Sequence, residues 1–270
     1  MDNGGAIAGF DSNNSKISNC NFKYNVAAGH IDPQGNHHGE GGAIYWENSN
    51  NLRVAHSTFE TDEAKLSGGS ISADNCNDSI IYNITTFDET AFRNGGAVAW
   101  SNSRNVIIDG SYFNDSGANY DGGTIYLSNV DAATIKNTGI NSTWASWGIG
   151  GGVYVDGNVT IDNVTFNDTH SYYDNATAIY FNSGISSVIN SAFTYSIKSM
   201  GIAKDANVTL IKNNITSDTP TKYIRYLIEN STVMVNTVDY AVWNNGNLWL
   251  DKNNFDNVIF NDGIKLSIKI

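Results

Sequence analysis

The sequence predicts an all-β fold: a right-handed, single-stranded parallel β-helix with about ten coils of roughly 27 residues. Three observations lead to this prediction. A Gly-Gly-small-Ile/Val tetrad recurs along the chain, an apolar anchor recurs downstream with the same period, and the residues between them alternate with a period of two. That alternation is the pattern of strands, so it excludes a helical solenoid.

The tetrad opens each predicted coil, and its middle copies are 27 residues apart. Clear copies occupy residues 4–7, 41–44, 68–71, 95–98 and 122–125, and looser copies occupy residues 150–153 and 176–179. We expect the paired glycines at a wide turn, where a positive φ or a close approach of two backbones requires them.

The second anchor closes each coil, and its spacing between Phe59 and Phe193 is 26 to 28 residues. The expected anchors are Phe22, Phe59, Phe87, Phe113, Ile140, Phe166, Phe193, Ile215, Val238 and Phe255. From about Met200 the glycine pairs vanish and the anchor spacing falls to 22 or 23. This change predicts narrower, less regular terminal coils over residues 200–270.

Three strands are expected in each coil. The first follows the tetrad and points two side chains inward, as at Ile44 and Trp46, and the third is short and ends at the anchor. The second is expected to point inward at Leu52/Val54, Ile80/Tyr82, Val106/Ile108, Ala133/Ile135 and Val159/Ile161. A single coil buries too little apolar surface to be stable, so stacking at about 4.8 Å must stabilise the fold.

One corner of the coil carries asparagine in successive repeats, at Asn48, Asn75, Asn102 and Asn129. Asparagine tolerates the left-handed backbone region, and stacked amides can hydrogen-bond from coil to coil. We therefore expect an asparagine ladder along this corner.

The repeats indicate one domain over residues 1–270, which we interpret as a segment of a larger surface protein. A net charge of −12 argues against a nucleic-acid partner, because such binding needs clustered Lys and Arg. No run of 18 apolar residues is present, so no membrane insertion is expected. Twelve Asn-x-Ser/Thr sequons fit an exported chain, and Cys20 and Cys76 are expected to be reduced.

The motif Gly-Gly-Ala-Ile/Val with a downstream Phe-x-x-Asn, as at residues 22–25, resembles the repeat of polymorphic outer-membrane adhesins. The Asn- and Thr-rich coils ending in Asn254-Phe255-Asp256-Asn257 look still more like the β-helix regions of adhesin-like surface proteins of methanogenic archaea. The resemblance covers nearly the whole chain. It implies an extracellular, cell-surface location and attachment to glycans or surface proteins of other cells.

Binding residues are expected on the outer face and in the wide turns, because irregular loops on a rigid scaffold commonly carry recognition. The outward position of the first strand forms an aromatic stripe at Tyr126, Tyr154 and Tyr180, which includes Tyr45 in an earlier coil. The wide turns add Tyr120, Trp144, Trp147, Tyr172 and Tyr173. We expect these side chains to form a contact surface for a glycan or a protein.

An enzyme is the alternative, because pectate lyases and polygalacturonases also use parallel β-helices. Glu47 and Asp74 are expected on adjacent coils, at a separation suited to a glycosidase carboxylate pair. The Gly-His-Gly and Arg-x-Lys motifs of polygalacturonases do not occur. We therefore favour a non-enzymatic segment, with a polysaccharide lyase or glycoside hydrolase as the second hypothesis and a spacer without ligand as the third.

No cofactor is expected, and two possible metal sites are weaker alternatives. His30, His37 and His38 lie in the long first turn with Asp32 and Glu40, and these residue types suit Zn²⁺. Their spacing matches no known zinc motif. The acidic turns could bind Ca²⁺ weakly, but the chain contains no Asp-x-Asp-x-Asp-Gly loop.

Overall fold

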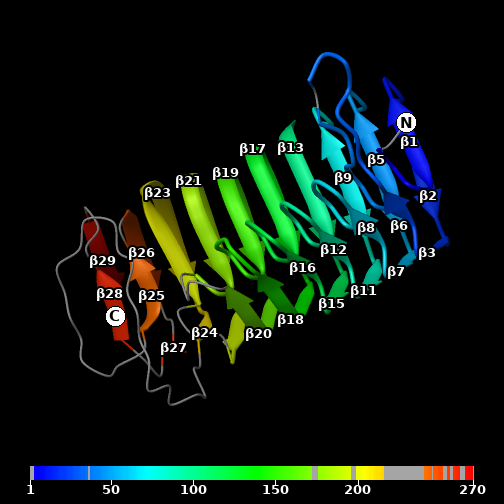
Figure 1. Ribbon diagram of the computed structural model, residues 1–270. Coiled ribbons are helices and arrows are strands. Elements are labelled where there is room, and N and C mark those ends of the chain that lie inside the picture. Colours follow the sequence, from blue (N-terminus) through cyan, green and yellow to red (C-terminus); the bar gives the residue numbers. More distant parts are fainter. Residues whose placement is uncertain are drawn as a thin grey trace.

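The computed structural model describes residues 3–35, 37–171, 176–195, 199–215, 240–244, 246–251, 254–255, 258–261 and 265–269. These residues form a parallel β-helix in which the chain winds into stacked coils along one axis (Figure 1). All paired strands are parallel, and none of the described residues is helical. Hence none of them forms a helix that could cross a membrane.

The first sheet contains the first strand of every coil, paired in sequence order. Its strands are β1 (Ile7–Phe10), β5 (Ile44–Glu47), β9 (Ile71–Asp74), β13 (Val98–Arg104), β17 (Ile125–Lys136), β19 (Val153–Asp162), β21 (Ile179–Ile189), β23 (Met200–Ile211), β25 (Tyr240–Asn244) and β28 (Val258–Asn261). The second strands join the same sheet as β2 (Lys16–Ser18), β6 (Arg53–Ala55), β10 (Ile80–Tyr82), β14 (Ile107–Asp109), β26 (Asn247–Asp251) and β29 (Lys265–Lys269). In the middle coils the first and second strands merge into one.

The second sheet holds the third strands, which end at the anchors. They are β3 (Asn21–Lys23), β7 (Thr58–Glu60), β11 (Thr85–Phe87), β15 (Tyr112–Asn114), β18 (Gly139–Ala145), β20 (Thr165–Ser171), β22 (Ala192–Thr194), β24 (Asn214–Ile215) and β27 (Asn254–Phe255). A two-residue strand follows in the early coils, as β4 (Val26–Ala27), β8 (Glu63–Ala64), β12 (Thr90–Ala91) and β16 (Gly117–Ala118). The wide turn then leads to the next coil.

The predicted register of the first strands is confirmed. Ile44 pairs with Ile71, and the same column continues through Val98 and Ile125, all buried. Two residues on, Trp46, Ala73 and Trp100 form one inward column, in which the small alanine lies between two indoles. This alternation of large and small side chains fills the core at each level.

The prediction of Phe87 as an anchor is wrong by one residue. Thr86 pairs with both Phe59 and Phe113 and is fully buried, whereas Phe87 points outward and is 45% exposed. Because of this shift, the anchors from Phe59 to Ile140 are each 27 residues apart.

The same coil shows a matching error in its second strand. Ile81, rather than Ile80 or Tyr82, pairs with Val54 and Ile108 in the core. Ile80 and Tyr82 are half-buried on the outer side.

The anchor spacing beyond Phe193 also differs from the prediction. Ile215 pairs with Phe193 on one side and directly with Phe255 on the other. Among the described residues, no anchor strand lies between β24 and β27. Val238, the anchor expected there, lies outside the described residues.

The asparagine ladder is confirmed with one change. Asn48, Asn75, Asn102 and Asn129 all have φ between 51° and 52°. Asn75 donates to Asn48 at 2.8 Å and Asn129 donates to Asn102 at 2.9 Å. Asn102 instead reaches the carboxylate of Asp74, at 2.6 Å, which ties the ladder to an acidic residue.

The paired glycines have the expected structural role at the wide turn. Gly95 has a φ of 64°, in the left-handed region. A Cβ on Gly96 would lie 2.1 Å from the carbonyl oxygen of Gly123 on the next coil. Only glycine lets the two backbones approach so closely. Cys20 and Cys76 are both free thiols, as expected.

Candidate functional site

The predicted aromatic stripe lies in one column on the outer face of the first sheet. Tyr126 pairs with Tyr154, which pairs with Tyr180. Their rings stack on one another, with centroids 5.1 Å and 5.9 Å apart and interplanar angles of 17° and 20°. Burial raises the pKa values of Tyr126 and Tyr154 above the ordinary value, so both hydroxyls are protonated and can donate hydrogen bonds.

The stacking limits what this tyrosine stripe can bind. A sugar packs on the face of an aromatic ring, but here adjacent rings cover one another's faces. The ring of Tyr180 also covers the next coil, because a Cβ on Gly201 would lie 2.8 Å from its Cδ2. The stripe therefore presents ring edges and hydroxyls.

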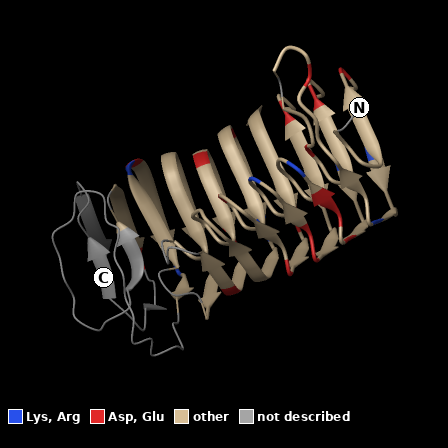
Figure 2. Cartoon of the chain, in the orientation of Figure 1, with Lys and Arg blue, Asp and Glu red and all other residues tan. Residues whose placement is uncertain are grey.

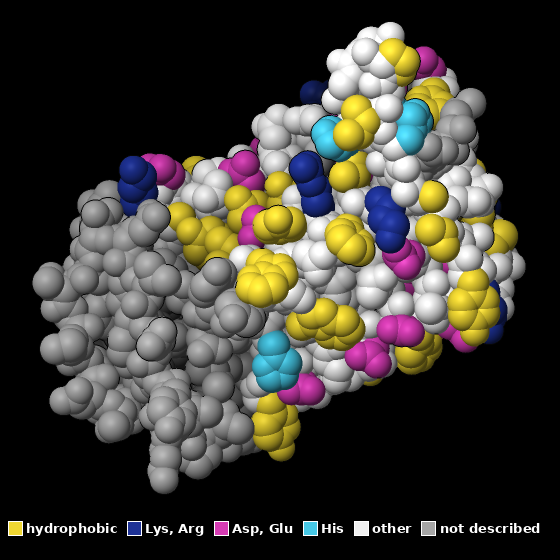
Figure 3. All heavy atoms as spheres, viewed as in Figure 1, with side chains coloured by type: hydrophobic (Ala, Val, Ile, Leu, Met, Phe, Trp, Pro, Cys, Tyr) yellow, Lys and Arg dark blue, Asp and Glu magenta, His cyan; other side chains and the backbone are white. Residues whose placement is uncertain are grey.

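Exposed aromatic side chains occur instead along the wide turns. Phe92, Tyr120 and Trp147 come from three successive coils and are 56%, 53% and 57% exposed. We call these three side chains the aromatic edge. Backbone hydrogen bonds link their turns directly, from Tyr120 N to Arg93 O at 2.8 Å and from Trp147 N to Asn119 O at 2.7 Å. Figure 3 shows hydrophobic side chains along this side of the rod, with Lys, Arg and acidic side chains among them.

The other predicted turn aromatics have different surroundings. Trp144 is half-buried against the preceding coil, where a Cβ on Gly117 would lie 2.1 Å from its Cε2. That contact makes Trp144 part of the packing between coils. Tyr172 and Tyr173 lie outside the described residues.

A small pocket of about 320 Å³ borders the aromatic edge, lined by Arg93, Asn94, Tyr120 and Asp121. Asp121 is held in place, because its Oδ1 accepts from the backbone N–H of Ile149 at 3.0 Å and its own N–H donates to Asn94 Oδ1 at 3.1 Å. Burial raises the pKa of Asp121 above its ordinary value. The pocket thus combines a ring, a guanidinium, an amide and a carboxyl group.

A larger cleft of about 590 Å³ lies over the early coils, on the outer face of β5, β9 and β13. Glu47 and Asp74 pair across adjacent coils, as predicted, and both line this cleft. Tyr45 donates to Glu47 Oε2 at 3.0 Å, and Asn102 holds Asp74. Figure 2 shows that Asp and Glu residues are concentrated toward this end of the rod.

Glu40 is the cleft residue that the sequence interpretation did not include among catalytic candidates. Burial, and then the charge of Asp74, raise the pKa of Glu40 to about 7. The hydroxyl of Ser72 lies 3.5 Å from its Oε2. The sequence contains one signal that could have identified Glu40. This residue directly precedes a glycine pair, at the position that Asp121 occupies three coils later.

The histidines of the long first turn do not assemble a zinc site. His30 and His38 stack with centroids 4.6 Å apart, and His38 Nε2 lies 3.3 Å from Asp32 Oδ2. His37 lines the acidic cleft. Over the described part of the chain, no group of three or more His, Cys, Asp or Glu side chains could hold a metal ion.

Comparison of the chain with protein-family models, with curated proteins and with solved structures gave no match. The candidate sites are therefore interpreted from their own geometry.

Proposed function

We propose that this chain is a cell-surface adhesin segment whose aromatic edge binds glycans on partner cells. One observation carries the proposal: Phe92, Tyr120 and Trp147 expose their rings on successive coils beside the pocket at Arg93 and Asp121. Buried aromatic rings only stabilise the fold, but exposed rings beside hydrogen-bonding groups suit recognition.

The chemistry of this surface fits a carbohydrate. The apolar face of a sugar ring packs on an aromatic face, and its hydroxyls need donors and acceptors nearby. Arg93 and Asn94 supply donors, and Asp121 supplies acceptors. The ammonium of Lys65 lies over the Phe92 ring, 4.7 Å from its centre, so it covers one face of that ring and leaves the other for a ligand. Tyr120 and Trp147 occupy equivalent positions on adjacent coils, about 4.8 Å apart, and Phe92 lies one position earlier in its own turn. An extended chain of sugars can therefore contact more than one coil.

An extracellular location is part of the same proposal. The resemblance of the Gly-Gly-Ala-Ile/Val repeats to surface adhesins and the sequons support it. Surface proteins of the partner cell are the alternative ligand, because exposed Trp and Tyr also favour protein interfaces.

Binding to a glycan array and to intact partner cells tests the proposal. We expect the double variant Tyr120→Ala/Trp147→Ala to lose at least tenfold in affinity, about 1.4 kcal/mol. Tyr24→Ala is the matched control, because Tyr24 is also exposed but lies at the corner after β3. If the wild-type chain binds no glycan and no cell, it is a spacer. If the double variant binds as well as wild type, the aromatic edge is not the site.

A second candidate function is hydrolysis or lysis of a polysaccharide in the acidic cleft. Glycosidases pair a protonated carboxyl group, which acts as the acid, with an ionised one that acts as base or nucleophile. Glu40, with its pKa of about 7, suits the acid, and Glu47 or Asp74 suits the ionised partner. A pKa raised by burial and a nearby like charge is typical of catalytic carboxyl groups.

Release of reducing ends or unsaturated products from a polysaccharide panel tests the second candidate. We expect Glu40→Gln and Glu47→Gln each to abolish product formation, while Glu60→Gln, on the outside of β7, leaves it unchanged. Absence of product with the wild-type chain would remove this candidate and leave the binding proposal intact.

A further inference from the structure

The acidic cleft over the early coils has charge of nearly one sign. Glu40, Glu47 and Asp74 line it, and none of the described residues around it is a Lys or Arg. The negative charges of Asp74 and Glu47 both reach Glu40, because each raises the pKa of its carboxyl group. Two histidines also line the cleft, and one of them, His38, already pairs with Asp32. The chain itself therefore leaves this negative charge largely uncompensated.

Neutral donors hold two of the carboxyl groups without cancelling their charge. Tyr45 donates to Glu47 Oε2 at 3.0 Å, and Asn102 Nδ2 donates to Asp74 Oδ1 at 2.6 Å. The other two oxygens, Glu47 Oε1 and Asp74 Oδ2, accept no hydrogen bond from a described residue. Glu47 and Asp74 are paired on adjacent strands, whose backbones are about 4.8 Å apart. One cationic group can therefore reach both free oxygens.

A buried amide adds an unused donor to the same cleft. Asn3 is 8% exposed and lines the cleft. Its Oδ1 accepts from the backbone N–H of Gly39, at 2.5 Å, and from that of Glu40, at 2.9 Å. Its Nδ2 donates to no described residue and is not sealed from solvent, so it opens on the cleft. Because buried polar groups are normally paired, this fixed donor indicates a ligand with an acceptor.

The arrangement suits an organic cation better than a metal ion. Among the described residues, no group of three or more His, Cys, Asp or Glu side chains could hold a metal. An ammonium group has three N–H donors, so it can bond to carboxylates that do not converge on one point. At about 590 Å³ the cleft has the size of a small-molecule site.

We propose that the acidic cleft binds amino sugars, with the protonated amine bonded to Glu47 Oε1 and Asp74 Oδ2 and a ring hydroxyl accepting from Asn3 Nδ2. A lysine side chain carries the ammonium group but no hydroxyl beside it, so it would leave Asn3 unused. A uronic acid carries a charge that the cleft repels. The inference rests on the cleft of the second candidate function but requires no hydrolysis there. If the cleft also hydrolyses a polysaccharide, the substrate is an amino-sugar polymer rather than a polyuronate.

Calorimetric titration of the whole chain with a glucosamine oligomer near pH 6, where the amines are largely protonated, tests the proposal. The N-acetylated oligomer of equal length removes the charge, an oligogalacturonate reverses it, and a lysine oligomer supplies the charge without hydroxyls. We expect the glucosamine oligomer to bind at least tenfold more tightly than the other three. Equal binding of the N-acetylated or the lysine oligomer would overturn the assignment to amino sugars, and so would absence of binding by the glucosamine oligomer.

Variants then locate the bound amine. Glu47→Gln and Asp74→Asn keep the shape of each side chain, and each should weaken binding of the glucosamine oligomer at least fivefold. Glu60→Gln, on the outside of β7, removes one negative charge elsewhere and should bind as wild type does. The aromatic-edge variant Tyr120→Ala/Trp147→Ala should also bind this oligomer normally. If both cleft variants bind as wild type does, or if only the aromatic-edge variant loses binding, the amine does not bind in the cleft and the proposal fails.

Discussion

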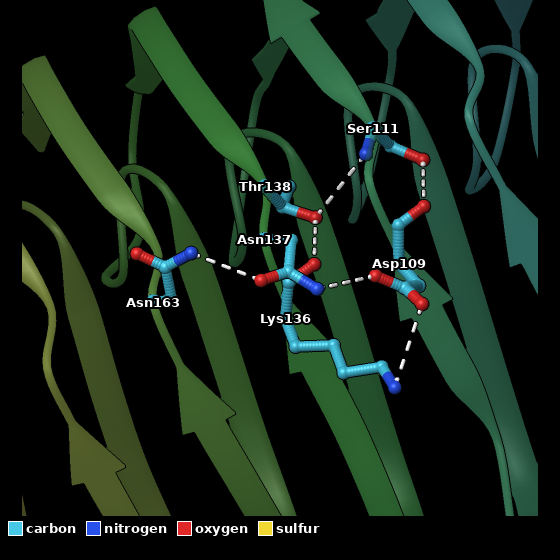
Figure 4. Close-up of polar contacts among 6 residues, drawn as sticks. All are labelled: Asp109, Ser111, Lys136, Asn137, Thr138 and Asn163. Atoms are coloured by element: carbon cyan, nitrogen blue, oxygen red, sulfur yellow. Dashed lines mark hydrogen bonds and ion pairs between the residues drawn. The ribbon is translucent and has the colours of Figure 1, made fainter.

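Asn163 donates from Nδ2 to Oδ1 of Asn137 on the preceding coil, at 2.9 Å, and Asn137 donates in turn to Oδ1 of Asp109, at 2.8 Å (Figure 4). Asn137 and Asn163 both have positive φ, at 51° and 55°. Beside them, Thr138 Oγ1 accepts from the backbone N–H of Ser111 at 3.4 Å. This corner is therefore held along the axis by side chains as well as by the backbone.

Replacing Asn137 tests the contribution of this corner. Asn137→Ala loses both amide hydrogen bonds. It also places alanine, whose Cβ disfavours positive φ, in the left-handed backbone region. Together these two effects should lower the free energy of unfolding by about 2 kcal/mol. Asn137→Gly loses the contacts but accepts the backbone angle, so about 1 kcal/mol is expected. Urea unfolding measures both values. Equal stabilities for wild type and both variants would show that the corner contributes nothing.

Gly96→Ala should be severely destabilising, by roughly 3 kcal/mol or more. The new methyl would meet the Gly123 carbonyl oxygen at 2.1 Å, and a backbone in a stacked coil cannot move away cheaply. Gly35→Ala is the control, because nothing lies within 4 Å of its Cβ position and only its φ of 85° is unfavourable. The urea midpoints of the two variants measure the difference. If the midpoint of Gly96→Ala equals or exceeds that of Gly35→Ala, the packing argument is refuted.

Thr86→Val should stabilise the chain by about 1 kcal/mol. Thr86 Oγ1 is buried without a hydrogen-bond partner among the apolar anchors, and valine has the same shape without the hydroxyl. Thr58→Val, on the exposed side of β7, is the comparison and should be slightly destabilising, because Thr58 Oγ1 donates to Asn21 Oδ1 at 2.9 Å. The melting temperatures of wild type, Thr86→Val and Thr58→Val test this prediction. A melting temperature of Thr86→Val below that of wild type would mean that the Thr86 hydroxyl has a hydrogen-bond partner.

Stability should fall as the pH rises above neutral. Burial raises the pKa of Glu89 to about 9, and the charge of Asp62 adds to this rise. The folded state therefore binds a proton that the unfolded state, with a carboxyl pKa of about 4.3, has released. This contribution is complete below pH 4 and is lost as the pH approaches 9.

Glu89→Gln carries no titratable proton, so its stability should decline less over this range. Urea midpoints at pH 5, 7 and 9 measure the difference. A wild-type stability that is constant or rises between pH 5 and pH 9 would contradict the raised pKa.

The period, the first strands and the asparagine ladder could be predicted from sequence because each has its own chemical signal. Ile44 and its equivalents are β-branched and follow glycine pairs, so their inward direction is unambiguous. The errors at Ile80, Tyr82 and Phe87 arose where three neighbouring residues are all acceptable in a strand. There, the backbone pairing of the adjacent coils decides which side chain is buried, and that pairing requires the structure.

The candidate sites were harder to predict for a different reason. Glu40, Asp62 and Glu89 look like solvated turn residues in a sequence, because acidic side chains are rarely buried. Their burial depends on how the wide turns fold over the coils. The stacking of Tyr126 on Tyr154 likewise depends on side-chain rotation, which residue alternation does not encode.

The repeat of the aromatic edge also sets how affinity should grow with ligand length. Phe92, Tyr120 and Trp147 present one ring per coil, so under the proposed function they would act as linked, weak subsites at a fixed spacing. Once the first unit of an oligomer is bound, each further unit binds as an intramolecular event at high effective concentration. Affinity should therefore rise steeply up to the number of units that spans three coils, and longer oligomers should gain little more. The chain would thus discriminate between polymers and monomers by valency rather than by the strength of any one contact.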